Sequence, residues 1–151
     1  MSDKRVAVAA WESLFRAQVS VMRHLHAEFP TNELSLNEYD VLFNLSQHDG
    51  WRLRIRELNK HLLLTQPSVS RLIDRLAARG LVTKSNDTAD VRGIIVELTE
   101  EGFALFRRVA VTHMQSIADH VGQAIDDEEL VQLSNLTEKL RLAEQGRAER
   151  D

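Results

Sequence analysis

Hydrogen-bonding side chains recur in one short segment, Thr65 to Arg79, whose apolar residues have the spacing of a helix with one buried side. Thr65 has the side chain of a helix N-cap. Pro67 follows in the first turn, where its missing amide hydrogen has no intrahelical partner to lose. Four apolar residues form the buried side: Val69, Leu72, Ile73 and Leu76. The opposite side of the predicted helix is therefore exposed.

The exposed side of this predicted helix has side chains suited to reading nucleic acid. Arg71 and Arg75 can bind guanine edges or phosphates, and Ser70 is small enough to let the backbone approach closely. We expect DNA contacts from six residues of the segment: Thr65, Gln66, Ser68, Ser70, Arg71 and Arg75. An ordinary surface helix with two arginines would show the same periodicity, so the spacing alone leaves that alternative open.

Positive charge is concentrated around this segment, although the whole chain is acidic. The net charge is −4, yet residues 51–92 contain nine Lys and Arg against four Asp and Glu, a local +5 that leaves −9 elsewhere. Counterion release depends on the contacting face and not on total charge, so this distribution is compatible with DNA binding, and equally with a solvated surface. The remaining basic residues that we expect to contact DNA are Arg54, Arg56, Lys60 and Arg92.

The elements that would position these residues are mainly helical. The expected order is helices over about 5–29, 37–48, 54–64 and 65–79, strands over 81–85 and 93–98, and two helices that begin at Thr99 and Asp126. Asn37 is the expected cap of the second helix, and Gly80 ends the fourth. The predicted fold class is mainly α with a small β-hairpin wing, the layout of a winged helix-turn-helix domain joined to further helices.

Four segments resemble the MarR family of transcription regulators. They are LNEYDVL at 36–42, LLTQPSVSRLIDRLAARGLV at 63–82, DVRG at 90–93 and VELTEEG at 96–102. The similarity extends from about Trp11 to Leu142 in the same order of elements. It implies a DNA-binding lobe over 36–100, with a recognition helix at 65–79 and a wing at 81–98. An N-terminal dimerisation helix would lie in 1–35 and C-terminal dimerisation helices in 101–151.

Two positions depart from the pattern of that family. The wing has Asp90-Val91-Arg92 where Asp-Arg-Arg is common, so Arg92 alone is left to enter a minor groove. We expect Asp90 to pair with Arg92 and hold the shape of the wing, although a surface ion pair of no consequence is the alternative. Arg56 stands where the first helix of the motif usually has a Ser or Thr cap, and we expect it to contact a phosphate instead.

The resemblance also implies a sequence-specific regulator that binds a pseudo-palindromic operator as a homodimer. As a repressor, it would be released by a small aromatic or phenolic ligand. One recognition helix reads only a half-site, so two copies are expected. Apolar residues of the first and last helices are candidates for joining them: Trp11, Phe15, Met22, Phe29, Leu130, Leu133, Leu136 and Leu140. Candidate ligand contacts are Trp11, Phe15, Arg16, His24 and Tyr39.

Other classes of protein have less support in the sequence. The absence of cysteine excludes disulfides and cysteine–zinc sites, and no phosphate-binding loop or nucleophile motif suggests an enzyme or a cofactor. His24 with His26, and His113 with His120, lack the spacing of a metal site, so a zinc-responsive regulator would need histidines that folding brings together. No segment is apolar enough to cross a membrane, and we expect a cytoplasmic protein. A winged module that binds protein instead of DNA is the main alternative.

Overall fold

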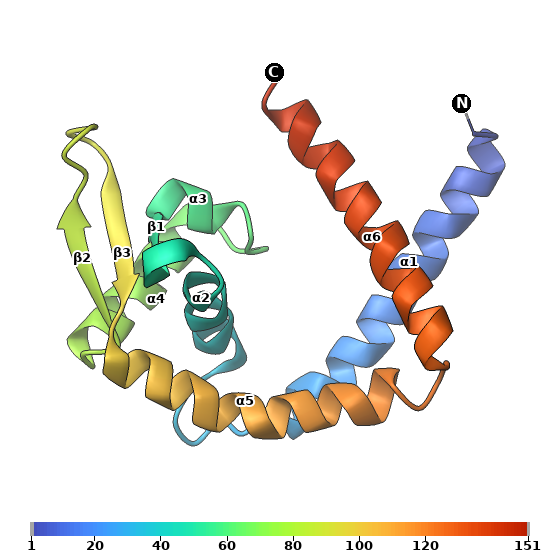
Figure 1. Cartoon of the computed structure of the whole chain (residues 1–151), viewed down its shortest axis with the longest axis horizontal. Helices are drawn as coiled ribbons and strands as arrows, with labels where there is room; N and C mark the ends of the chain where they lie inside the picture. Colours follow the sequence, from blue (N-terminus) through green and yellow to red (C-terminus); the bar gives the residue numbers. More distant parts are fainter. Residues whose placement is uncertain (1, 151) are drawn as a thin grey trace. The chain divides into compact units, whose positions relative to one another are not determined.

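The computed structural model describes residues 2–150, which fall into two compact units. The winged unit is residues 28–114, and the helical unit is residues 1–27 with 115–151. The elements are α1 Lys4–Glu28, α2 Leu36–Ser46, the 3-10 turn η1 Asp49–Trp51, β1 Arg52–Arg54, α3 Ile55–Asn59, α4 Gln66–Ala78, β2 Val82–Asn86, β3 Ile94–Leu98, α5 Glu100–Val121 and α6 Asp127–Ala148 (Figure 1). No helix in the described residues is both long enough and apolar enough to cross a membrane.

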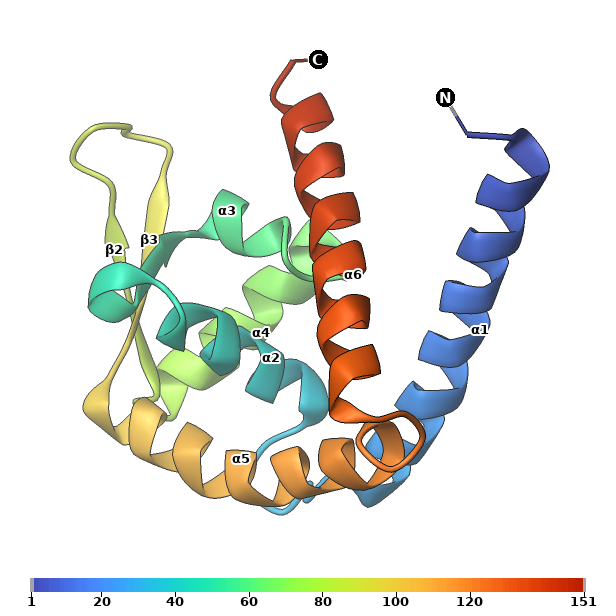
Figure 2. The same cartoon turned by 45° about the vertical axis from the view of Figure 1, so that its right-hand side comes forward.

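The winged unit is built around an apolar core shared by its helices and its sheet. Side chains from α2, α3, α4 and β3 are fully buried in it: Val41, Leu42, Leu45, Leu58, Val69, Ile73, Leu76 and Val96. The sheet is antiparallel in the order β1-β3-β2, and the loop that joins β2 and β3 projects away from α2 and α4 (Figure 2). This arrangement confirms the predicted fold class of a mainly helical chain with a hairpin wing.

The short strand β1 makes the sheet three-stranded and extends the predicted hairpin, consistent with the one or two strand residues that the sequence allows before the third helix. Arg52, Leu53 and Arg54 pair with Glu97, Val96 and Ile95 of β3. This pairing attaches the wing to the segment that leads into α3, because β1 is followed directly by that helix.

The start of α2 corrects one predicted cap. Ser35, and not Asn37, is the N-cap: its side chain accepts the Glu38 amide hydrogen, and the Glu38 carboxylate accepts that of Ser35. This reciprocal pair is a capping box, which satisfies two amide groups that would otherwise lack partners. The helix ends at Ser46, and Gly50 lies beyond it in η1, where it adopts a φ of 68°.

The third helix is shorter than predicted and covers Ile55–Asn59 instead of 54–64. Arg54 occupies its N-cap position without a side-chain hydrogen bond, so the missing cap lies at Arg54 and not at Arg56. The three leucines that follow are consecutive, and one helix face cannot bury all three. Leu63 is accordingly 98% exposed in the loop before α4.

Local signals define both ends of α4 as predicted. The Thr65 hydroxyl accepts the Ser68 amide hydrogen, and Pro67 lies in the first turn. Gly80 has a φ of 74° just after the C-cap Arg79, a conformation that a Cβ would disfavour. The predicted recognition helix therefore has the predicted bounds and the predicted buried side.

Apolar side chains of the helical unit are exposed within a single chain. Asp126 and Glu129 form a capping box at the start of α6. Three of the leucines expected to join two copies, Leu133, Leu136 and Leu140, are 41%, 67% and 48% exposed. The described residues of one chain therefore leave this side of α6 partly uncovered.

Candidate nucleic-acid interface

The outer side of α4 is exposed along its whole length. Val69, Leu72, Ile73 and Leu76 fix the opposite side in the core with at most 4% of their surface exposed. The exposed residues are Gln66, Pro67, Ser70, Arg71, Asp74, Arg75 and Ala78. A helix held in this way presents a rigid row of polar side chains to a partner, and a B-DNA major groove is wide enough to admit it.

A chain of hydroxyl groups orients the first arginine of this surface. The Thr65 hydroxyl donates to the Ser68 hydroxyl at 2.9 Å, and Arg71 Nη2 donates to the same Ser68 oxygen at 3.3 Å. Arg71 therefore lies along the N-terminal turn of α4, where unpaired amide groups and the helix dipole favour an anion. Arg75 has no carboxylate within ion-pair distance among residues 2–150, so its charge is available to an external anion.

One acidic residue on the same surface is neutralised by the wing. Asp74 Oδ1 lies 2.6 Å from Lys84 Nζ on β2. This pair removes a negative charge that would repel phosphate and connects α4 to the hairpin. Spacing along the sequence does not reveal this pair, because Lys84 belongs to a different element.

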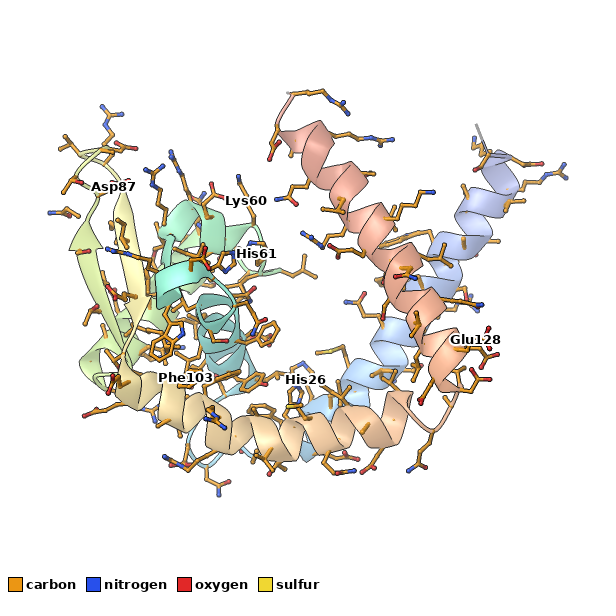
Figure 3. All side chains as sticks on the ribbon, in the orientation of Figure 1. His26, Lys60, His61, Asp87, Phe103 and Glu128 are labelled. Carbon is orange, nitrogen blue, oxygen red and sulfur yellow. The ribbon has the colours of Figure 1, made fainter. Side chains whose placement is uncertain are left out.

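The wing loop is fastened to the start of α3 by a buried carboxylate. Asp87 lies in the loop that joins β2 and β3 (Figure 3). Arg54 Nε lies 2.6 Å from its Oδ2, and the Asp87 side chain is only 5% exposed. Asp87 Oδ1 also accepts the Ala89 amide hydrogen at 3.0 Å. Arg54, expected to contact DNA, is thus engaged within the protein, and Asp87 is a wing residue that the sequence analysis missed.

Asp90 shapes the turn of the wing, though not through the guanidinium of Arg92. Its Oδ1 accepts the Arg92 amide hydrogen at 3.0 Å, and its carbonyl oxygen accepts that of Gly93 at 2.9 Å. Asp90 Oδ2 lies 3.8 Å from Arg56 Nη1 on α3. The Arg92 side chain is exposed and has no ion-pair partner in the described residues, which leaves it directed to solvent at the wing.

Lys60 has a partner within its own turn. Its Nζ lies 3.2 Å from Glu57 Oε1, and both side chains are more than 40% exposed. An exposed pair of this kind is worth about 0–1 kcal/mol, so a phosphate can replace the carboxylate at little cost.

The candidate ligand contacts fall in different parts of the chain. Trp11, Phe15, Arg16 and His24 lie on α1 in the helical unit, where the Trp11 and Phe15 rings are 5.9 Å apart. Tyr39 lies in the winged unit, 5% exposed, and contacts the rings of Phe29, Phe43, Phe106 and His113. Burial raises the pKa of Tyr39, and the neighbouring Asp40 raises it further. Tyr39 is therefore a core residue of the winged unit that stays neutral.

A groove within the winged unit was not foreseen from the sequence. It has a volume of about 500 Å³ and lies between the end of α2, η1 and the first half of α5. The Trp51 and Phe103 rings stack at 4.4 Å, and the Arg107 guanidinium carbon lies 5.8 Å from the centre of the Phe103 ring. Trp51 has a φ of 56°, a left-handed conformation that is uncommon for a bulky residue.

These features define a winged helix-turn-helix protein with an exposed recognition helix, the class of protein that binds double-stranded DNA. Residues 33–93 match the model of the MarR family. The chain is a DNA-binding transcriptional regulator of the MarR type.

A curated relative and a solved structure are similar to this chain over most of their length. The transcriptional repressor YetL of Bacillus subtilis is 29% identical over 131 residues, which are 85% of this chain and 78% of YetL. The structure of AbsC, a MarR family regulator of Streptomyces coelicolor, matches with a TM-score of 0.76 and 25% identity over 97% of this chain and 99% of AbsC.

Two further solved structures are of regulators whose binding to DNA, or its control by a small molecule, was the subject of the work. Sco3205 of Streptomyces coelicolor, a MarR family regulator in complex with DNA, has a TM-score of 0.72 and 26% identity over 97% of this chain and 90% of its own. BpsR of Bordetella bronchiseptica, whose DNA binding is regulated by 6-hydroxynicotinic acid, has a TM-score of 0.71 and 26% identity over 86% of this chain and 91% of its own.

Proposed function

We propose that this regulator is a repressor that binds a pseudo-palindromic operator as a homodimer, with α4 in the major groove of each half-site. The observation that carries this proposal is the exposed outer side of α4, on which Arg71 is oriented by hydroxyl groups and Arg75 has no protein partner. Arg71, Arg75 and Gln66 have donors for base edges, while Thr65 and Ser68 lie at the helix N-terminus and are suited to phosphate. The small side chain of Ser70 lets the backbone of α4 approach the base edges closely.

The wing and α3 supply contacts to the DNA backbone in this proposal. Arg92 enters the minor groove, because it is exposed beside the wing turn and narrow grooves attract arginine. On binding DNA, Arg56 leaves its ion pair with Asp90 and Lys60 leaves its ion pair with Glu57, and each binds a phosphate instead. Arg54 supports the interface through Asp87, so its contribution to affinity is mainly the position of the wing.

The proposed dimer joins the helical units of two copies. Trp11 and Phe15 on α1 and Leu136 and Leu140 on α6 are each about half exposed or more, which is a large apolar surface for a small protein. A two-fold dimer would place two recognition helices on half-sites one helical turn apart. The relatives support the biological role, since YetL is a repressor and Sco3205 binds DNA.

We further propose that a small aromatic anion releases the operator. BpsR responds to such a compound. In this chain the groove beside Trp51 offers two stacked rings and the Arg107 guanidinium, which has no carboxylate partner within residues 2–150. Trp51 directly precedes β1, so a ligand there would act on the strand that carries Arg54 and, through it, on the wing.

The DNA part of the proposal is tested with DNA from upstream of the protein's own gene. We expect a sequence-selective complex in fluorescence anisotropy, with a log affinity that falls steeply as log salt concentration rises. Arg71→Ala should lower the discrimination against substituted operator bases by about 1–3 kcal/mol, and Arg92→Ala should weaken all sequences evenly. Arg147→Ala, in the last turn of α6, is the control and should change neither quantity. Absence of any selective complex at low salt would favour the protein-binding alternative.

A further inference from the structure

Two histidines that are distant in the sequence lie together in the helical unit. The ring of His24, near the end of α1, stacks on that of His120, near the end of α5, with centroids 4.7 Å apart and planes inclined by 18°. Glu28, the last residue of α1, follows His24 by four positions and lies on the same side of that helix. One possible ligand atom from each of the three residues lies within 4.8 Å of the other two.

We propose that His24, Glu28 and His120 bind a divalent transition-metal ion of the zinc type. Two imidazole nitrogens and one carboxylate oxygen are a donor set that zinc accepts, with the fourth position left for water or another ligand. A tetrahedral zinc ion with bonds of about 2.0–2.1 Å holds its ligand atoms roughly 3.3 Å apart. The 4.8 Å limit is wider than this spacing, so binding an ion would draw the three side chains closer together.

The exposure of the three side chains allows an ion to reach them from solvent. His24 and Glu28 are exposed, and His120 is half-buried. Imidazole donors favour zinc, nickel and copper over magnesium and calcium, which prefer oxygen ligands. A bound ion would cross-link the end of α1 to the end of α5 and would stabilise the folded chain by an amount that rises with the logarithm of the free ion concentration.

The spacing that indicates this site in the sequence is between a histidine and a glutamate, and not between two histidines. His24-x-x-x-Glu28 places two ligands on one helix face, while His26 lies on another side of the same helix and His113 is buried in the winged unit. Pairing His24 with His26, and His113 with His120, therefore groups the wrong residues. The third ligand comes from α5, and only the fold brings it to the other two.

The proposal is tested on the full chain with zinc alone, by competition against a fluorescent zinc chelator. We expect one ion per chain, and at least a tenfold loss of affinity in both His24→Gln and His120→Gln. His26→Gln is the matched control, because this exposed histidine lies on α1 two positions from His24 (Figure 3). It should bind zinc as the unaltered protein does, and a large excess of magnesium should not displace the zinc.

Three results would overturn the site. They are an affinity unchanged in both His24→Gln and His120→Gln, an equal loss in His26→Gln, or no zinc bound by the unaltered protein. Circular dichroism shows whether each variant keeps its helices; if His120→Gln does not, the exposed His24→Gln and Glu28→Gln decide the question. A visible absorption band of bound cobalt, shifted by Glu28→Gln, provides a readout that needs no DNA and is independent of the proposed repressor function.

Discussion

At the scale of single residues, the wing depends on the carboxylate of Asp87 and the guanidinium of Arg54. The carboxylate is almost fully buried and lies 2.6 Å from Arg54 Nε, whereas Arg54 keeps 40% of its side chain exposed. Loss of the charge removes this ion pair but leaves the Arg54 guanidinium partly hydrated. The damage should therefore be local and moderate.

We expect Asp87→Asn to lower the free energy of unfolding by about 2 kcal/mol, because it removes the ion pair with Arg54 and weakens the hydrogen bond from the Ala89 amide, and hydrogen bonds to charged groups contribute on that order. Urea denaturation followed by circular dichroism measures the change. Asp90→Asn is the control: its pair with Arg56 is longer, at 3.8 Å, and both side chains are exposed, so the loss should be below about 1 kcal/mol. Equal effects of the two substitutions would contradict the role assigned to Asp87.

His113 makes the stability of the winged unit depend on pH. It is 8% exposed among the rings of Phe29 and Tyr39, and burial lowers its pKa below the ordinary 6.5. Below pH 6.5 the unfolded chain therefore binds a proton more readily than the folded protein does, so stability falls as the pH drops through 6.5 toward the lower folded pKa.

In His113→Phe this contribution to the pH dependence should disappear. The midpoint of urea unfolding, measured between pH 7.5 and 5, should fall less steeply in this variant than in the unaltered protein. His26→Gln, a change of an exposed histidine, should keep the original slope. A slope that His113→Phe leaves unchanged would show that other groups cause the acid sensitivity.

At the scale of elements, the N-terminus of α4 combines a structural and a functional role in Thr65. Its hydroxyl caps the helix and orients Ser68, which in turn accepts from Arg71. Thr65→Ala should destabilise the protein by about 1 kcal/mol, the usual cost of a lost cap, whereas Thr65→Ser should be nearly neutral. Thermal unfolding checks both variants, and a Thr65→Ser variant as unstable as Thr65→Ala would argue against a capping role.

The elements also show which parts of the fold were predictable from the sequence. The bounds of α4 are set by neighbours along the chain, namely Thr65, Pro67 and Gly80, and the sequence predicted them. The length of α3 depends on which of Leu62, Leu63 and Leu64 pack against the rest of the molecule. The predicted end of this helix at residue 64 was therefore wrong. The pairs of Arg54 with Asp87 and of Asp74 with Lys84 join separate elements, and local spacing contains no signal for them.

At the scale of the whole molecule, the exposed apolar residues of the helical unit bear on the proposed dimer. Leu136→Glu combined with Trp11→Glu should convert a species of twice 17.2 kDa into one of 17.2 kDa in light scattering coupled to size exclusion. Burying two charges at such an interface costs more than an apolar contact contributes. Leu63→Glu, at a 98% exposed position in the winged unit, should leave the mass unchanged. A monomeric unaltered protein would contradict the dimer.

The buried Asp87 has a consequence for how this wing can vary. Because Asp87 holds the base of the loop, Thr88, Ala89 and Val91 contribute little to its position, and Val91 is 95% exposed. The tip can therefore change its side chains while its attachment stays constant. Val91→Arg should fold normally and restore the second basic side chain that the family commonly has beside Arg92. Substitutions at the tip of the wing can therefore change the affinity for DNA without changing the recognition helix.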